Sequence, residues 1–351
     1  MTLGVTLIII GATLFVLLTA AAYSVYAERK VSAFIQQRPG PNRVGPFGLL
    51  QPLADVVKLL LKEDIIPAEG DKFVHFISPI ISVVIALTAF AVIPFGFNGT
   101  NFIMVADVNI GVLYMLALGS IAVYGVTLAG WSSNSKYALL GGLRASAQMV
   151  SYELSLGLTV VSVILLTNFM VDEPAGAGYL SLVTIVEAQA SSGIWNIFLN
   201  PIGFLIFVTC SFAEANRTPF DLVEAEQELV GGFHTEYSSM KFATFFVAEY
   251  LHVIIASMFI TTMFLGGYHG PLEGVLGVSE WGWVAQTAWS LGWFSAKTLF
   301  WVLVFIWVRW TIPRFKYDQL MNIGWKSFLP LSILNLMLVA LIGFIVWRMT
   351  M

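Results

Sequence analysis

The chain has 351 residues, of which 58% are hydrophobic and 11% are charged, and its mean hydropathy is +0.84. A soluble domain carries about 25% charged residues, so these charges are too few to cover a soluble globule. The single cysteine, Cys210, excludes a disulfide scaffold and a cysteine-bound iron–sulfur cluster, and the net charge of −4 argues against nucleic acid as a partner. The remaining class is a polytopic membrane protein.

Long charge-poor runs follow one another along the chain. A membrane-spanning helix needs about 20 mostly apolar residues, whereas a membrane β-barrel shows short alternating segments. We therefore predict an all-α polytopic membrane protein with eight transmembrane helices, forming one membrane domain over residues 1–351. The expected spans are residues 3–27, 77–97, 108–131, 154–171, 194–213, 242–268, 288–308 and 327–347.

The basic residues predict the orientation of these spans. Every Lys and Arg except Lys297 and Arg348 falls before the second span or in the loops that follow the third, fifth and seventh spans. Loops on the cytoplasmic side of a membrane carry an excess of Lys and Arg. We therefore expect these loops to face inward and both termini to face outward.

The first inward loop contains an amphipathic segment. Residues 38–48 hold three prolines and three glycines, which exclude a regular helix there. Residues 51–62 follow with helical spacing of apolar positions on one face, at Leu53, Val56, Val57, Leu60 and Leu61. The pattern predicts an amphipathic helix on the inner membrane surface after the first span, either with or without a ligand.

The third inward loop is rich in acids. Thr218 to Asp221 fits the start of a helix, and the pair Gly231-Gly232 fits its end. The acidic residues of this region are Glu214, Asp221, Glu224, Glu226, Glu228 and Glu236. A solvated acidic helix is one interpretation. The apolar residues between the acids favour the other, in which carboxylates line a wet cavity against the bilayer.

Two ionisable residues, Glu249 and Lys297, fall inside expected spans, and Glu153 lies at the inner start of the fourth. Such residues are rare in membranes and mark ion or proton paths, although Glu249 and Lys297 could instead form a structural pair. The sequence shows no phosphate loop or complete dinucleotide fingerprint, and its four histidines lack metal-ligand spacing. We expect no metal site and no redox cofactor in this chain.

Several longer motifs together resemble one family. The chain is similar to the H-type membrane subunits of bacterial NADH:quinone oxidoreductase, respiratory complex I, which are equivalent to subunit 1 of the mitochondrial enzyme. The resemblance runs from the first span to the last. It rests on the stretches Ala27-Glu28-Arg29-Lys30, Arg38 to Pro52, Glu214 to Leu222, Ala248-Glu249-Tyr250 and Pro313 to Met321.

This resemblance implies a proton-pumping enzyme subunit that forms a quinone chamber and carries no redox centre of its own. Quinone would be the substrate, with nothing bound covalently. NADH, FMN and iron–sulfur clusters would belong to partner subunits. Partners would include hydrophilic-arm subunits, one bearing the terminal iron–sulfur cluster, and small and antiporter-like membrane subunits within the lipid bilayer. The bacterial inner membrane is expected rather than the mitochondrial one.

The resemblance also implies roles for particular residues. The quinone path would involve Arg29, Gln36, Asp55, Phe220, Phe233, Arg309 and Arg314. Proton coupling would involve Glu153, Glu214, Glu224, Glu226, Glu228, Glu249 and Lys297. Two alternatives remain at this point: a component of a membrane-bound hydrogenase or formate hydrogenlyase, and an independent ion transporter.

Overall fold

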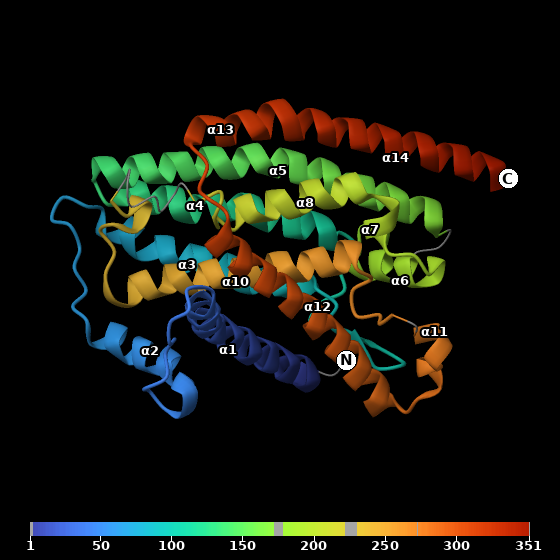
Figure 1. The fold of residues 1–351 in the computed structure, drawn as a ribbon, viewed down its shortest axis with the longest axis horizontal. Coiled ribbons are helices and arrows are strands. Elements are labelled where there is room, and N and C mark those ends of the chain that lie inside the picture. Colours follow the sequence, from blue (N-terminus) through green and yellow to red (C-terminus); the bar gives the residue numbers. More distant parts are fainter. Residues whose placement is uncertain (1–2, 172–177, 222–229, 272, 351) are drawn as a thin grey trace.

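The structure is a computed structural model that describes the whole chain except residues 1–2, 172–177, 222–229, 272 and 351. Most helices run lengthwise beside one another as a bundle (Figure 1). The long helices are α1 (Leu3–Ile35), α3 (Lys72–Ala89), α4 (Gly111–Ser132), α5 (Lys136–Met170), α10 (Ser239–Phe264), α12 (Trp283–Thr311) and α14 (Leu329–Thr350). With their helical extensions, these seven are long and apolar enough to cross a membrane. The chain is therefore an all-α multi-pass membrane protein.

Shorter elements connect the long helices. The helices among them are α2 (Gln51–Leu61), α6 (Leu182–Ser192), α7 (Asn196–Leu199), α8 (Pro201–Glu214), α11 (Glu273–Leu276) and α13 (Tyr317–Asn322). Single turns of 3-10 helix are η1 (Pro46–Gly48), η2 (Phe90–Val92), η3 (Gly232–His234) and η4 (Val278–Glu280), and the π-helical segment η5 (Ile323–Phe328) leads into α14. The strands β1 (Gly96–Phe97) and β2 (Phe102–Ile103) form a small antiparallel hairpin.

Several helix bounds differ from the expected spans. Helix α1 continues to Ile35, and α5 begins at Lys136, well before the expected start of a span at residue 154. Charged side chains end a charge-free run without ending a helix, so the runs underestimate helix length. The expected fifth span, residues 194–213, is divided into α7 and α8, because Pro201 lacks the N–H that would continue the first helix. The Asn200 side chain accepts a hydrogen bond from Gly203 N and caps α8.

Helices α5 and α10 organise the packing of the bundle. Helix α5 contacts α4, α8 and α14, while α10 contacts α1, α3 and α12. The core includes Phe207, Leu251, Ile260 and Phe264, whose side chains are fully buried. Close helix approach relies on small residues: a Cβ placed on Gly142 would meet the backbone of α4 at 3.3 to 3.5 Å.

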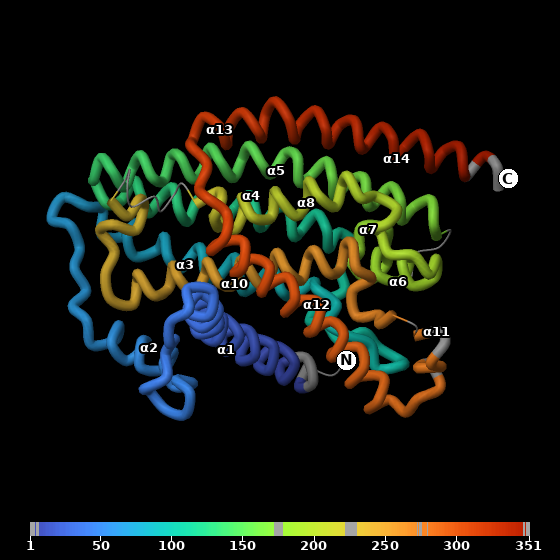
Figure 2. Tube along the Cα trace, viewed as in Figure 1, coloured from blue at the N-terminus to red at the C-terminus, as the bar shows by residue number. Residues whose placement is uncertain are grey.

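The end of the bundle that carries α2 is called the α2 end. The expected amphipathic helix is confirmed as α2, and its apolar face is exposed in this chain. Figure 2 traces the connection from α2 to the start of α3 along this edge of the bundle. The connection is attached to the start of α10: Ser238 Oγ donates to Glu63 O and accepts from Ile65 N, and Lys241 pairs with Asp64 at 2.9 Å. The start of α1 and the end of α14 both lie away from α2 (Figure 1).

Candidate functional site

A buried ion network lies at the α2 end, centred on Arg217. This residue follows α8, and its side chain is 4% exposed. Its guanidinium pairs with Glu28 of α1 at 3.1 Å and with Glu249 of α10 at 2.9 Å. Burial opposes the charge of Arg217, but the carboxylates of Glu249 and Glu28 outweigh this effect and raise its pKa. Arg217 therefore joins two helices that are far apart in the sequence.

Two further residues complete this network. Arg309, near the end of α12, pairs with the second oxygen of Glu28 at 2.8 Å. The Tyr250 hydroxyl donates to Glu28 at 2.9 Å, and the Arg217 guanidinium lies 4.5 Å from the centre of the Tyr250 ring. Two carboxylates thus face two guanidinium groups in an enclosed place, where charges are retained only when they are paired.

A second ion pair lies beside the network and involves Asp221. Arg314 approaches the Asp221 carboxylate to 2.8 Å, and the Asp221 side chain is only 3% exposed. The neighbouring Phe220 is buried and packs edge-on against Tyr152, with ring centres 5.2 Å apart. Phe220 and Arg314 therefore belong to the same packed region after α8.

The quinone-path residues nearer the surface are partly exposed. Arg29 pairs with Asp55 of α2 at 2.7 Å, and Gln51 donates to the same carboxylate. Gln36 lies just beyond α1 and accepts a hydrogen bond from Arg38 at 2.6 Å. These groups occupy the face between α1 and α2.

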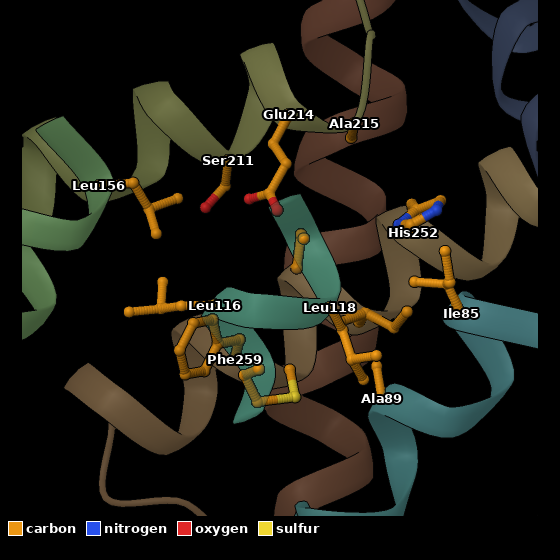
Figure 3. Close-up of a pocket in the computed structure, with 14 residues that line it drawn as sticks. Ile85, Ala89, Leu116, Leu118, Leu156, Ser211, Glu214, Ala215, His252 and Phe259 are labelled. Atoms are coloured by element: carbon orange, nitrogen blue, oxygen red, sulfur yellow. The ribbon is translucent and has the colours of Figure 1, made fainter. Parts of the chain in front are cut away.

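Glu214 lies at the end of α8, next to a small cavity of about 40 Å³ between α3, α4, α5, α8 and α10. Figure 3 shows its carboxylate and the His252 ring projecting into this cavity. A second cavity, of about 50 Å³, is lined by Glu214, Glu249 and His252. Glu153 of α5 lies nearby, since it accepts a hydrogen bond from Ser120 of α4, whose neighbour Gly119 lines the first cavity. Three of the expected proton-coupling carboxylates are therefore grouped in one region.

Lys297 occupies a different place from these acids. Its ammonium donates to the carbonyls of Leu265, Gly267 and His269, all beyond the end of α10, and lies 4.7 Å from the Trp195 ring centre. Glu249 lies about 24 Å from Leu265 along α10, at roughly 1.5 Å per residue. The alternative of a Glu249–Lys297 pair is wrong, because Arg217 is the partner of Glu249.

A histidine–carboxylate group adjoins Lys297. His269 lies between Glu187 and Glu273, at 3.0 and 2.9 Å, and Tyr268 donates to Glu187. Burial disfavours the protonated ring, but hydrogen bonds to Glu187 and Glu273 outweigh it and raise the pKa of His269 to about 9. This group ties the loop after α10 to α6.

The remaining expected residues have different outcomes. Phe233 is buried in η3 and packs edge-on against Phe245. Glu224, Glu226 and Glu228, together with most of the expected acidic helix, lie outside the described residues. Among the described residues, no three His, Cys, Asp or Glu side chains form a group that could hold a metal ion.

Sequence reasoning missed the central members of the network. Glu28, Arg217 and Tyr250 all stand within the family motifs, but the motifs alone gave them no role. One feature of the sequence could have identified Arg217. It is the single Lys or Arg among the acids of residues 214–236. Its pairing with Glu28 joins positions 189 residues apart, and no local spacing reveals such a contact.

The helical bundle and its enclosed ion network define a multi-pass membrane protein with charged groups at the α2 end. Comparison with known proteins narrows this class. Residues 7–340 match the family model described as NADH dehydrogenase. The H subunit of NADH-quinone oxidoreductase from Salinibacter ruber is 56% identical over 331 residues, covering 93% of this chain and 92% of that protein.

Other relatives agree with this match. NADH-quinone oxidoreductase subunit 8 of Rhodothermus marinus is 55% identical, and an H subunit of the same enzyme from Geobacter metallireducens is 52% identical, with 93% and 92% of this chain covered. Each of these proteins is covered to the same extent as this chain. The chain belongs to the NADH dehydrogenase family, among the H subunits of complex I, and the resemblance seen in its motifs is confirmed.

Proposed function

We propose that this chain forms part of the quinone chamber of a proton-pumping NADH:quinone oxidoreductase and couples quinone reduction to proton translocation. The observation that carries the proposal is the buried network of Glu28, Arg217, Glu249 and Arg309. Through Glu249, this network reaches the second cavity beside Glu214. Membership of the family supports the substrate and the reaction.

The quinone would need an apolar groove for its tail and hydrogen-bond donors for its head group. A groove of about 650 Å³ between α1, α10 and α12 has a mostly apolar lining that includes Leu17, Phe294 and Val302, which suits an isoprenoid tail. The head group accepts hydrogen bonds, and donors are available at the α2 end. The residues proposed to border this path are Arg29, Gln36, Asp55, Phe220, Phe233, Arg309 and Arg314. The exposed apolar face of α2 would meet the bilayer or the hydrophilic-arm subunits that close the chamber.

Proton coupling would follow from the change of charge on reduction. A reduced quinone head takes up protons, and this demand would act on the adjacent carboxylates. Breaking a buried ion pair costs about 3–5 kcal/mol, and moving one charge against 100 mV costs about 2.3 kcal/mol. The free energy of a rearrangement at Arg217 is therefore large enough to drive the movement of one charge across the membrane. The proposed acids are Glu153, Glu214, Glu224, Glu226, Glu228 and Glu249. Lys297, which the family resemblance places among the coupling residues, lies apart from these acids, and its proposed role is to hold the loop after α10.

The proposal includes a membrane arrangement. Helix α8 has 14 residues, which extend about 21 Å, and with α7 it would form the fifth of eight spans. Both termini would face outward in a bacterial inner membrane, with the basic α2 end inward. Quinone would be the substrate, and NADH, FMN and iron–sulfur clusters would be held by partner subunits. The other partners would be small and antiporter-like membrane subunits.

Charge-neutralising variants of the acids test this function. We expect Glu214→Gln and Glu249→Gln to assemble but to lose most coupled quinone reduction, since neither amide accepts or releases a proton at neutral pH. The measurement is NADH:quinone activity and proton uptake in vesicles containing the purified complex, normalised to assembled subunits. Full pumping by both variants would overturn the proposal.

A further inference from the structure

His252 connects the two cavities beside Glu214. The first cavity has three polar side chains in its lining, Ser211, Glu214 and His252 (Figure 3). The second is lined by Glu214 and His252 as well, and adds Glu249 and Asn216. Of the described titratable residues around these cavities, Glu214 and His252 alone border both.

The position of His252 on α10 suits proton transfer. It follows Glu249 by three residues, and residues at this spacing lie on the same helix face with Cβ atoms about 5–6 Å apart. Among the described residues, none forms a hydrogen bond with either ring nitrogen of His252, so both remain available to the cavities. Imidazole can accept a proton on one nitrogen while it releases a proton from the other.

Each cavity is large enough for water. A water molecule needs about 10–15 Å³ of such space and two to four polar partners. The volumes of about 40 and 50 Å³ therefore have room for a short water chain on each side of the ring. The polar partners are supplied by Glu214 and His252 in both cavities, with Ser211 in one and Glu249 in the other.

The second histidine at this place is less suited to the task. His234 of η3 lines the second cavity but not the first. Of these two cavities, His234 therefore borders only the second, so it cannot join them.

We propose that His252 is the proton-transfer residue between Glu249 and Glu214. This inference rests on the proposed function and names one further residue of its proton path. In the step, protonated Glu249 gives its proton through cavity water to one imidazole nitrogen, and the other nitrogen gives its proton through cavity water to the Glu214 carboxylate. The waters stay neutral, and the ring changes from one neutral tautomer to the other. No net charge stays on the ring afterwards, and nothing is oxidised or reduced.

Three substitutions separate proton transfer from packing. His252→Leu keeps most of the volume, His252→Asn keeps polarity, and His252→Glu restores a group that exchanges protons. Ser257→Ala is a matched control on the same helix, because its hydroxyl donates to Val253 O within α10 and lines neither cavity. Each variant is studied in the complete complex, reconstituted in vesicles and normalised to assembled subunits.

We expect the Leu and Asn variants to slow coupled quinone reduction about tenfold. Loss of a positioned acid–base group typically slows a reaction about 10²–10⁴-fold. The expected effect is smaller because cavity water would still carry some protons past residue 252. Their rates should fall further in D₂O than the wild-type rate does, whereas the Glu variant should regain most activity and the Ser257→Ala control should match wild type. Wild-type rates and isotope effects in the Leu and Asn variants would overturn the inference, as would equal loss in the Glu variant.

The same experiment distinguishes the relay from the function on which it rests. If Glu214→Gln and Glu249→Gln lose activity while the His252 variants keep it, protons pass between the acids without His252, and only the relay fails. If all of these variants pump normally, the proposed function fails as well.

Discussion

Arg217 and Lys297, which lie near opposite ends of the bundle, have different kinds of partner for their buried charges. At the α2 end, Arg217 and Arg309 face the carboxylates of Glu28 and Glu249, and cavities adjoin the group. At the opposite end, the ammonium of Lys297 is surrounded by three backbone carbonyls. A charge held by other charges changes its energy when any neighbour changes protonation. The backbone carbonyls that hold Lys297 do not titrate, so they do not change the energy of its charge in this way.

The two charged sites also differ in how much of the fold their contacts join. The network around Arg217 joins α1, α10, α12 and the segment after α8, so its rearrangement would reach several helices. The hydrogen bonds of Lys297 reach only the loop after α10, and its one other contact named above is with the Trp195 ring. We therefore expect the network around Arg217, rather than Lys297, to respond to changes in protonation.

The largest expected effect comes from removing the central base. Arg217→Gln leaves Glu28 and Glu249 enclosed with Arg309 alone, and breaking a buried pair costs about 3–5 kcal/mol. We expect loss of assembled complex, measured by copurification of the partner subunits. Arg217→Lys keeps the charge but loses the forked geometry, so it should recover assembly in part. Normal assembly and activity with Gln would contradict the central role of this network.

A smaller loss of stability is expected from substitution of Lys297. This variant directly tests the difference between the Arg217 network and the backbone-held Lys297. Lys297→Met removes three hydrogen bonds to carbonyls, which we expect to cost about 3 kcal/mol of stability. Turnover per assembled complex should stay near wild type, in contrast to Glu249→Gln. Thermal unfolding in detergent and quinone reduction are the paired measurements. Slower turnover with unchanged thermal stability would instead support the proton-coupling role suggested by the family resemblance.

The smallest effect depends on pH and involves His269. Its folded-state pKa of about 9 exceeds the ordinary value of 6.5, so its protonated form stabilises the fold. This contribution is complete below about pH 6.5 and is lost as the pH rises through 9. Allowing for its partial exposure, we expect His269→Asn to cost about 1–2 kcal/mol at pH 6 and almost nothing near pH 10. A thermal-stability difference from wild type that is independent of pH would refute this assignment.

Much of the fold was predictable because it depends on composition and local pattern. Apolar runs located the long helices, and the spacing of Leu53, Val56 and Leu60 located α2. Helix ends were predicted less well, since Glu153 and Arg144 lie within α5 rather than in a loop. A charged side chain on a helix can reach a partner or a cavity without ending the helix.

The candidate site was predictable as a set of residue types but not as a set of pairs. Glu214 and Glu249 stood out as acids in or next to apolar segments, and the motifs assigned them to a family. The partner of Glu249 was not predictable, because Lys297 and Arg217 were both bases at plausible depths. His252 gave no signal in the sequence, since a single histidine in an apolar helix is usually a packing residue.

The amino-acid sequence by itself determined the class of protein, its family and the end of the bundle where basic residues collect. These properties follow from the solvent preference of side chains and from motifs that can be read along the chain. The tertiary structure alone decided that Arg217 joins Glu28 to Glu249, that Lys297 binds backbone carbonyls, and that His252 borders both cavities. These contacts join positions far apart in the chain, and they exist only once the helices have packed.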